Sequence, residues 1–349
     1  MQHSEELKNA TTEAGPKPVL VRGKPVVGIE SAGRHVKELS RVSPWKGVAA
    51  IAFDWLVIAV CFGVYGLFPG VWTWLILAPV IGGRQHALLI LMHDAAHYRI
   101  LPSHQWNDRV SNVFCSYPFL IITQGYRANH LMHHFYLNSD KDPDWTRKQK
   151  ESGWSFPVSL PALFRLLIRE LLGYGLYNNF KMMTDLDKNT IASPNKNAHS
   201  GKITHLVAIA SIHLLAVLLS IRTGHLNELL LLWYLPFATF LPLALKVRSI
   251  ARHFGLQERR PGAGDDDLKM SRNYFPSRWE KVLMIPHHIG YHLDHHLYPS
   301  VPFYNLPKLH KLLMQVPDYA ARAHQNQTVF SLKRNGVVHD LTAGKVSDV

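Results

Sequence analysis

The chain has 349 residues, of which 47% are apolar and only 18% charged, and its formal net charge is +13. Soluble proteins average about one quarter charged residues, so the deficit indicates a large surface that does not face water. Two cysteines exclude both a disulfide scaffold and a cysteine-based zinc module. Histidine is unusually abundant, with 22 residues against 25 aspartates and glutamates together. This composition favours a basic, histidine-rich membrane protein.

Four apolar segments are long enough to cross a bilayer, whose hydrocarbon core needs about 20 helical residues. They cover residues 46–68, 71–92, 203–221 and 226–247. Short turns join the first two and the last two. We therefore expect an all-α integral membrane protein with four transmembrane helices in two hairpins and a cytoplasmic helical catalytic cap.

Lysine and arginine are concentrated in residues 1–46, in the middle segment 93–202 and after residue 248, whereas the two hairpin turns hold only Arg222. The positive-inside rule then predicts that both termini and the middle segment are cytoplasmic. Buried helices of a soluble protein would not show this asymmetry. Positive flanks also account for the net charge without nucleic-acid binding.

The remaining segments are expected to be simpler. Residues 1–45 should form a polar, mostly disordered tail, residues 46–316 the membrane domain, and residues 317–349 a polar, exposed C-terminal tail. The stretch 156–177 fits either an interfacial amphipathic helix or a helix packed under the catalytic part.

Three histidine clusters share one design. They contain His93 and His97, then His130, His133 and His134, and finally His292, His295 and His296. On a helix, spacings of three and four place side chains on one face. Eight imidazoles exceed the four ligands of a tetrahedral zinc, so two transition-metal ions of higher coordination number are expected. Imidazole binds zinc, copper, iron and nickel, and the ligands alone do not select among them.

The pattern HxxxH, HxxHH and HxxHH after membrane hairpins resembles the membrane fatty acid desaturase and hydroxylase superfamily. Two longer stretches carry the same resemblance, RANHLMHHFYLNSDKDPDW at 127–145 and YHLDHHLYPSVPFYNLPKLH at 291–310. The match extends from about Asp54 to about His310. It implies that the eight histidines ligate a non-haem centre of two iron ions that uses O₂.

The same resemblance suggests further site residues. The superfamily usually supplies one more ligand just after the last membrane helix, and His253 occupies that place. Relatives often carry an acidic residue directly before it, whereas this chain has Arg252. Asp94 and Asp294 are candidates for orienting ligand imidazoles by hydrogen bonds. For Asn129 and the aspartates at 140, 142 and 144, caps and surface turns compete with that role.

The implied reaction is desaturation of an acyl chain of a lipid or related apolar-tailed substrate. Hydroxylation or ketolation of a lipid or carotenoid, and desaturation of a small metabolite, remain alternatives on the same centre. HxxxH is one residue shorter than the first box of acyl-CoA desaturases, which disfavours a CoA thioester. A histidine-rich metal transporter would need ligands near the membrane midplane.

Electrons must come from a separate donor, because neither a cysteine-rich cluster site nor GxGxxG nor a cytochrome b5 motif is present. A ferredoxin, a rubredoxin, or cytochrome b5 with its reductase is implied. The short tails without a fused electron carrier favour a bacterial plasma membrane.

Overall fold

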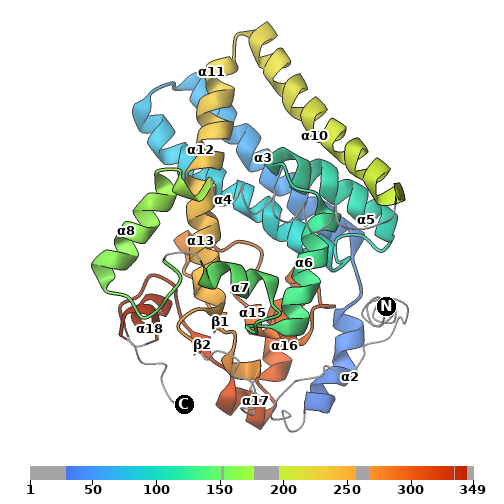
Figure 1. Cartoon of the computed structure of the whole chain (residues 1–349), viewed down its shortest axis with the longest axis vertical. Helices are drawn as coiled ribbons and strands as arrows, with labels where there is room; N and C mark the ends of the chain where they lie inside the picture. The colour runs from blue at the N-terminus through green and yellow to red at the C-terminus, as the bar shows by residue number, and fades with distance from the viewer. Residues whose placement is uncertain (1–28, 151–152, 177–195, 257–266, 334, 344–349) are drawn as a thin grey trace.

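The computed structural model describes residues 29–150, 153–176, 196–256, 267–333 and 335–343 (Figure 1). Four of its helical segments are long and apolar enough to cross a membrane: Pro44–Leu67, Val71–Ala96, Ile203–Thr223 and Leu226–His253. They match the four predicted segments. The second and the fourth continue several residues past the predicted ends, and these extra turns carry histidines.

The first two spans are α3 (Pro44–Leu67) and α4 (Val71–Ala96), which pack against each other. The third lies within α10 (Lys196–Thr223). The fourth is built from α11 (Leu226–Leu229), the π-helical turn η3 (Leu230–Tyr234), α12 (Leu235–Ala238) and α13 (Phe240–His253). Its regular pattern is interrupted beside Pro236 and Pro242, because proline lacks the N–H that a helix interior requires.

The α4 helix forms the centre of the molecule. In the most apolar 18-residue stretch of α4, 72% of the residues are buried. The corresponding share in the third span is 6%, so α10 stands largely apart from the bundle (Figure 1). Every residue of α4 from Ile81 to Ala96 is buried. The helix packs against α3, α13, α6 (Thr123–Tyr136) and α14 (Arg278–Leu283). It therefore connects the apolar helices to the histidine-bearing part.

Short elements surround the lower half of α4 and α13. They are α5 (His104–Ser111), η1 (Asn112–Ser116), η2 (Tyr117–Phe119), α7 (Pro143–Gln149), α8 (Leu160–Leu171), η4 (Asp267–Lys269), α15 (His292–Leu297), η5 (Phe303–Asn305) and α16 (Leu306–Leu313). The regular secondary structure of the described part is helical except for β1 (Asn273–Tyr274) and β2 (Gln325–Asn326), which pair in parallel. Leu163 of α8 is buried on the α13 side, whereas Phe164 and Leu172 are exposed.

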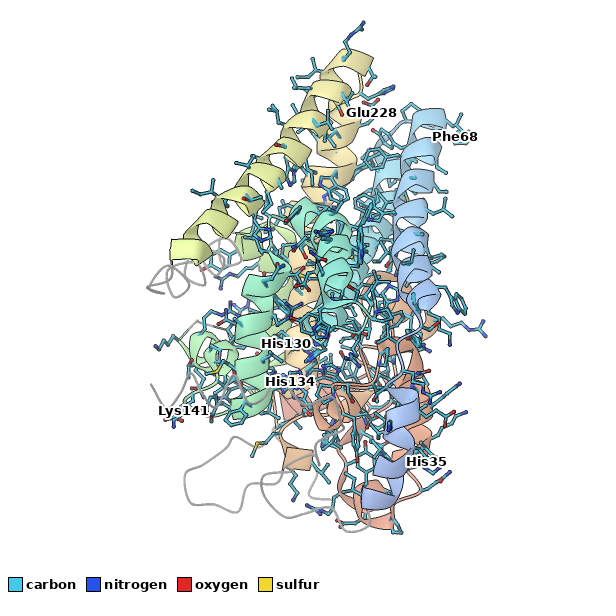
Figure 2. All side chains as sticks on the ribbon, turned by 90° about the vertical axis from the view of Figure 1, so that its right-hand side faces the viewer. His35, Phe68, His130, His134, Lys141 and Glu228 are labelled. Atoms are coloured by element: carbon cyan, nitrogen blue, oxygen red, sulfur yellow. The ribbon has the colours of Figure 1, made fainter. Side chains whose placement is uncertain are left out.

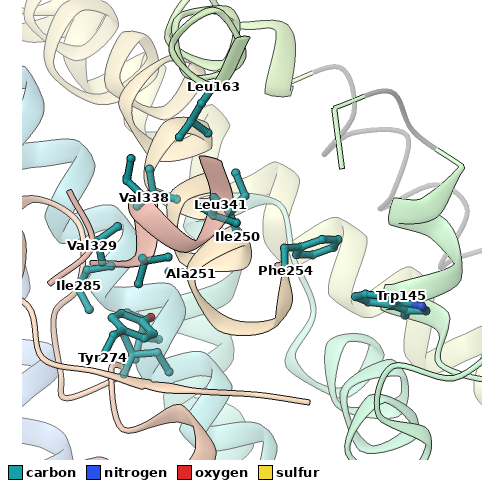
Figure 3. Close-up of a cluster of buried hydrophobic side chains, with 14 residues drawn as sticks. Trp145, Leu163, Ile250, Ala251, Phe254, Tyr274, Ile285, Val329, Val338 and Leu341 are labelled. Carbon is teal, nitrogen blue, oxygen red and sulfur yellow. The ribbon is translucent and has the colours of Figure 1, made fainter. Parts of the chain in front are cut away.

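The prediction of an exposed C-terminal tail is wrong for residues 317–333 and 335–343. They form α17 (Pro317–Arg322), β2 and α18 (Val337–Ala343). Val329, Val338 and Leu341 are buried in one apolar cluster with Ile250 of α13 (Figure 3). The apolar residues of this segment are too few and too irregularly spaced to show as a pattern in the sequence. The C-terminal segment is therefore part of the core.

The prediction of a disordered N-terminal tail is also wrong where it can be checked. Residues 29–39 form α2 (Ile29–Leu39), and its Val36 is fully buried against Leu309 and Leu313 of α16. Residues 1–28 lie outside the described residues. The N-terminal helix thus covers the helix that follows the third histidine cluster.

Glu280 of α14 holds the C-terminal segment in place. Its carboxylate accepts the backbone N–H groups of Val329 and Phe330 at 3.0 and 2.9 Å and the hydroxyl of Thr328 at 2.7 Å. Glu280→Ala leaves these donors without an acceptor, which costs about 1–3 kcal/mol per buried group. We expect a lower midpoint of thermal unfolding in detergent, with Lys281→Ala on the exposed face of α14 as the control. Equal midpoints in the two variants would contradict this role.

Candidate metal centre

Nine imidazoles converge below the apolar helices in two groups. The first contains His93, His97, His130, His134 and His295, and the second contains His133, His253, His292 and His296. Within each group the candidate ligand atoms lie within 4.8 Å of one another. His130 and His134 lie far along the molecule from Phe68 and Glu228, which mark the two turns between apolar helices (Figure 2). All nine histidines predicted as ligands are therefore brought together.

Four helices contribute these side chains, and two of them serve both groups. On α6, His130 and His134 are four residues apart and point to the first group, whereas His133 points to the second. On α15, His295 belongs to the first group, and His292 and His296 belong to the second. The HxxHH spacing fits this division, because its first and third histidines lie almost in line on the helix and its second histidine lies on the adjoining strip of the surface.

The spacing between ring nitrogens fits metal ions better than hydrogen bonds. In the first group, Nε2 of His130 lies 2.9 Å from Nε2 of His97 and 3.1 Å from Nε2 of His134. In the second, Nε2 of His292 lies 2.8 Å from Nε2 of His253 and 2.9 Å from Nε2 of His296. A neutral nitrogen that faces two others cannot satisfy both by hydrogen bonds. Ligands about 2.1 Å from one ion, at right angles, lie about 3 Å apart.

The electrostatics of the groups also favour metal binding. Burial, followed by the charges of Arg99 and Arg127, lowers the pKa of His97 to about 3. Burial, followed by neighbouring imidazoles, holds the pKa values of His130 and His134 well below the ordinary value. Metals bind the neutral imidazole, so these rings stay in the ligand form at neutral pH.

Asp142, which the sequence offers as a candidate, and Met270, which it does not, hold imidazoles of the second group in orientation. A carboxylate oxygen of Asp142 lies 2.8 Å from Nδ1 of His133, and the backbone carbonyl of Met270 lies 3.2 Å from Nδ1 of His253. Each contact leaves Nε2 free to point into the group. An orienting role and a cap are the two alternatives for Asp142 in the sequence, and it has both roles, because its other oxygen caps α7 through the N–H groups of Asp144 and Trp145.

The three residues predicted to orient ligands behave differently. Asp94 accepts the N–H of Phe303 at 2.8 Å, and its carboxylate is 3.6 Å from Nδ1 of His93, too far for a hydrogen bond. Asp294 lies 2.8 Å from Nδ1 of His310 and accepts a hydrogen bond from Asn273, so it binds a histidine outside both groups. Within the part of the chain described, Asn129 makes no hydrogen bond to any of the nine histidines. Both aspartates position the helices rather than the imidazoles.

One further buried network lies beside the site. Asp54 of α3 forms an ion pair with Arg84 of α4 at 3.0 Å, and its other oxygen lies 2.6 Å from Nε2 of His287. Arg84 also donates to the carbonyl of Val282 at 2.6 Å. His287 is thus used to attach the segment before the third cluster to the apolar helices, and it joins neither imidazole group.

Comparison with known proteins agrees with this geometry. Over 296 residues the chain is 27% identical to a dihydrorhizobitoxine desaturase of Bradyrhizobium elkanii, covering 81% of this chain and 80% of that protein. It is 26% identical, also over 296 residues, to a sphingolipid delta(4)-desaturase/C4-monooxygenase of Homo sapiens, with 83% and 80% covered. A probable fatty acid desaturase of Sorghum bicolor is 25% identical over 274 residues, with 76% and 69% covered. The fatty acid desaturase family model matches residues 69–327, and the chain belongs to that family.

Proposed function

We propose that this chain is an O₂-dependent oxidoreductase that introduces a double bond into the acyl chain of a lipid or a related apolar-tailed substrate. Two iron ions would be held by the nine imidazoles, one ion in each group. The observation that carries the proposal is the convergence of these imidazoles, in two groups with ligand-like spacing, in a chain of the fatty acid desaturase family. The relatives named above as desaturases support the same reaction class.

When bound, the two ions supply the oxidant, derived from O₂, that an unactivated C–H bond requires. The balance is one O₂, two electrons, two protons and the two hydrogens of a CH₂–CH₂ unit, which give CH=CH and two waters. The residues of the protein orient the ligand imidazoles and exclude water. Asp142 and the Met270 carbonyl fix two ring orientations, and the buried lower half of α4 excludes water from the site.

The membrane arrangement is part of the proposal. The two pairs of apolar helices would enter from one side, with both termini and the active site in the cytoplasm, and the bacterial plasma membrane is the expected location. The electrons would come from a separate ferredoxin, rubredoxin, or cytochrome b5 with its reductase. The lysines and arginines flanking the apolar segments support this orientation.

Untargeted mass spectrometry tests the reaction directly. The wild type and His295→Ala are expressed in the same host with a reductase system, and extracted lipids and small metabolites are compared. We expect a species found only with the wild type that is two hydrogens lighter than a host compound. A species found only with the wild type that has gained oxygen without losing hydrogen would contradict desaturation and indicate hydroxylation.

A further inference from the structure

Two arginines on the last turns of α13 are buried without a counter-charge. Arg248 is 5% exposed and Arg252 is 8% exposed, and they lie one turn apart. Neither makes an ion pair within the described part of the chain, and the hydrogen bond between Arg248 and the phenol of Tyr126 brings no negative charge to the pair. Burying a charge costs several kcal/mol unless a partner compensates it. The pair is therefore costly as it stands.

Four other buried cations among the described residues are paired. Arg84 has Asp54, Arg127 has Asp108, Lys148 has Asp144, and Arg272 has Asp340. Arg248 and Arg252 thus differ from these four cations, because neither has a carboxylate partner within the described ranges. They mark the place where α13 borders the imidazole groups.

Nearby carboxylates are already engaged. Asp94 lies within electrostatic range of Arg248, but it accepts the N–H of Phe303. Asp144 lies within range of Arg252, but it is bound by Arg147 and Lys148. Both of these carboxylates are therefore held by other partners, and neither forms an ion pair with Arg248 or Arg252.

Several donors around the pair lack partners as well. The Nε and one Nη of Arg248, the Nε of Arg252 and the hydroxyl of Tyr274 are buried without a hydrogen-bond partner. The ring of His86 is buried beside them and faces the backbone of Met284. Arg248 and Arg252 act electrostatically on Tyr274 and on His86, so these groups from α13, β1 and α4 share one neighbourhood. A cluster made mainly of donors and positive charge fits an anion.

The same neighbourhood adjoins both imidazole groups. Arg252 directly precedes His253 and acts on His292 of the second group, and both arginines act on His295 of the first. An anion held here lies next to the place where hydrogen is removed. Metal ions in the two groups would add positive charge and strengthen the need for it.

We propose that Arg248 and Arg252 bind an anionic group of the substrate, a carboxylate or a phosphate, so that the carbons oxidised lie only a few bonds from that group. Guanidinium groups match both oxyanions in bidentate geometry. This inference rests on the proposed function and narrows its substrate class.

The proposal is tested by measuring how tightly three probes bind to the purified, metal-loaded protein in a non-ionic detergent. The three probes share one alkyl chain and differ in their head group. The probes are dodecanoate, dodecyl phosphate and the uncharged dodecanol, each measured by equilibrium dialysis. We expect at least one anionic probe to bind the wild type about 10- to 100-fold more tightly than dodecanol, as charge-assisted hydrogen bonds provide. The tighter of the two anionic probes identifies the source as carboxylate or phosphate.

Variants then test whether Arg248 and Arg252 cause the preference for anionic probes over dodecanol. Arg252→Gln and Arg248→Gln are expected to abolish it, whereas Arg252→Lys should retain part of it. Arg322→Gln, which removes one charge from a partly exposed pair with Asp318, is the control and should bind like the wild type. Equal binding of all three probes by the wild type would overturn the proposal and leave water as the partner of the pair. This result needs no variant to fold.

The anion site and the proposed function fail separately. A desaturated product with no preference for anionic probes would refute the site and leave the function standing. An anionic preference that requires the arginines, in a protein that forms no desaturated product, would refute the function and leave the site standing.

Discussion

Replacing a single histidine, in either group, should remove the metal ion of that group and nearly all activity. We expect His134→Ala, in the five-membered group, and His296→Ala, in the four-membered group, each to retain about one ion per chain. Changes to residues that merely orient ligands cost about 10- to 100-fold, so loss of a ligand should lower turnover by at least ~100-fold. Metal content is measured by mass spectrometry of the digested protein, and turnover by product formation.

The exposed His35 on α2 provides the matched control. His35→Ala removes an imidazole of the same protein that belongs to neither group, and it should leave metal content and turnover unchanged. If His134→Ala and His296→Ala both kept the full complement of metal, the two groups would not be separate ion sites.

Asp142→Asn should weaken metal binding without removing a ligand. One oxygen of Asp142 caps α7, and the other faces Nδ1 of His133 and the N–H of Asn138 at 2.8 and 3.0 Å. An asparagine that keeps the cap presents an NH₂ group to these two donors. His133 must then turn or change tautomer, and we expect metal affinity or activity to fall by about 10- to 100-fold. Metal retention during dialysis against a chelator measures the effect.

Asp140→Asn is the control for this change, because Asp140 is exposed two residues earlier in the same loop. It should lose metal at the wild-type rate. A loss of thermal stability in Asp142→Asn with unchanged metal retention would show that Asp142 acts only as the cap of α7.

Much of the site could be predicted because its signals are local. Membrane-length segments appear as uninterrupted apolar runs, and spacings of three and four place histidines on one helix face whatever the rest of the fold. The division of the histidines between two groups could not be predicted. It depends on how α6 and α15 are rotated toward α4 and α13, which tertiary packing determines.

The predictions that failed or stayed open involve residues whose role depends on distant partners. Asp142 fits either a turn or an orienting role by its sequence, and its contact with His133 appears only once α6 and α7 are placed. The C-terminal segment is polar on average, and its few apolar residues become a core only against α13. Arg248 and Arg252 fit a positive flank of a membrane helix, yet both are buried.

The most direct test of the whole account is the metal content of the purified wild-type chain. Inductively coupled plasma mass spectrometry on protein expressed with ample iron should find close to two iron ions per chain, and fewer in His134→Ala and in His296→Ala. A wild-type protein that is folded and holds no iron, or a single zinc, would contradict the assignment of the nine imidazoles to a di-iron centre.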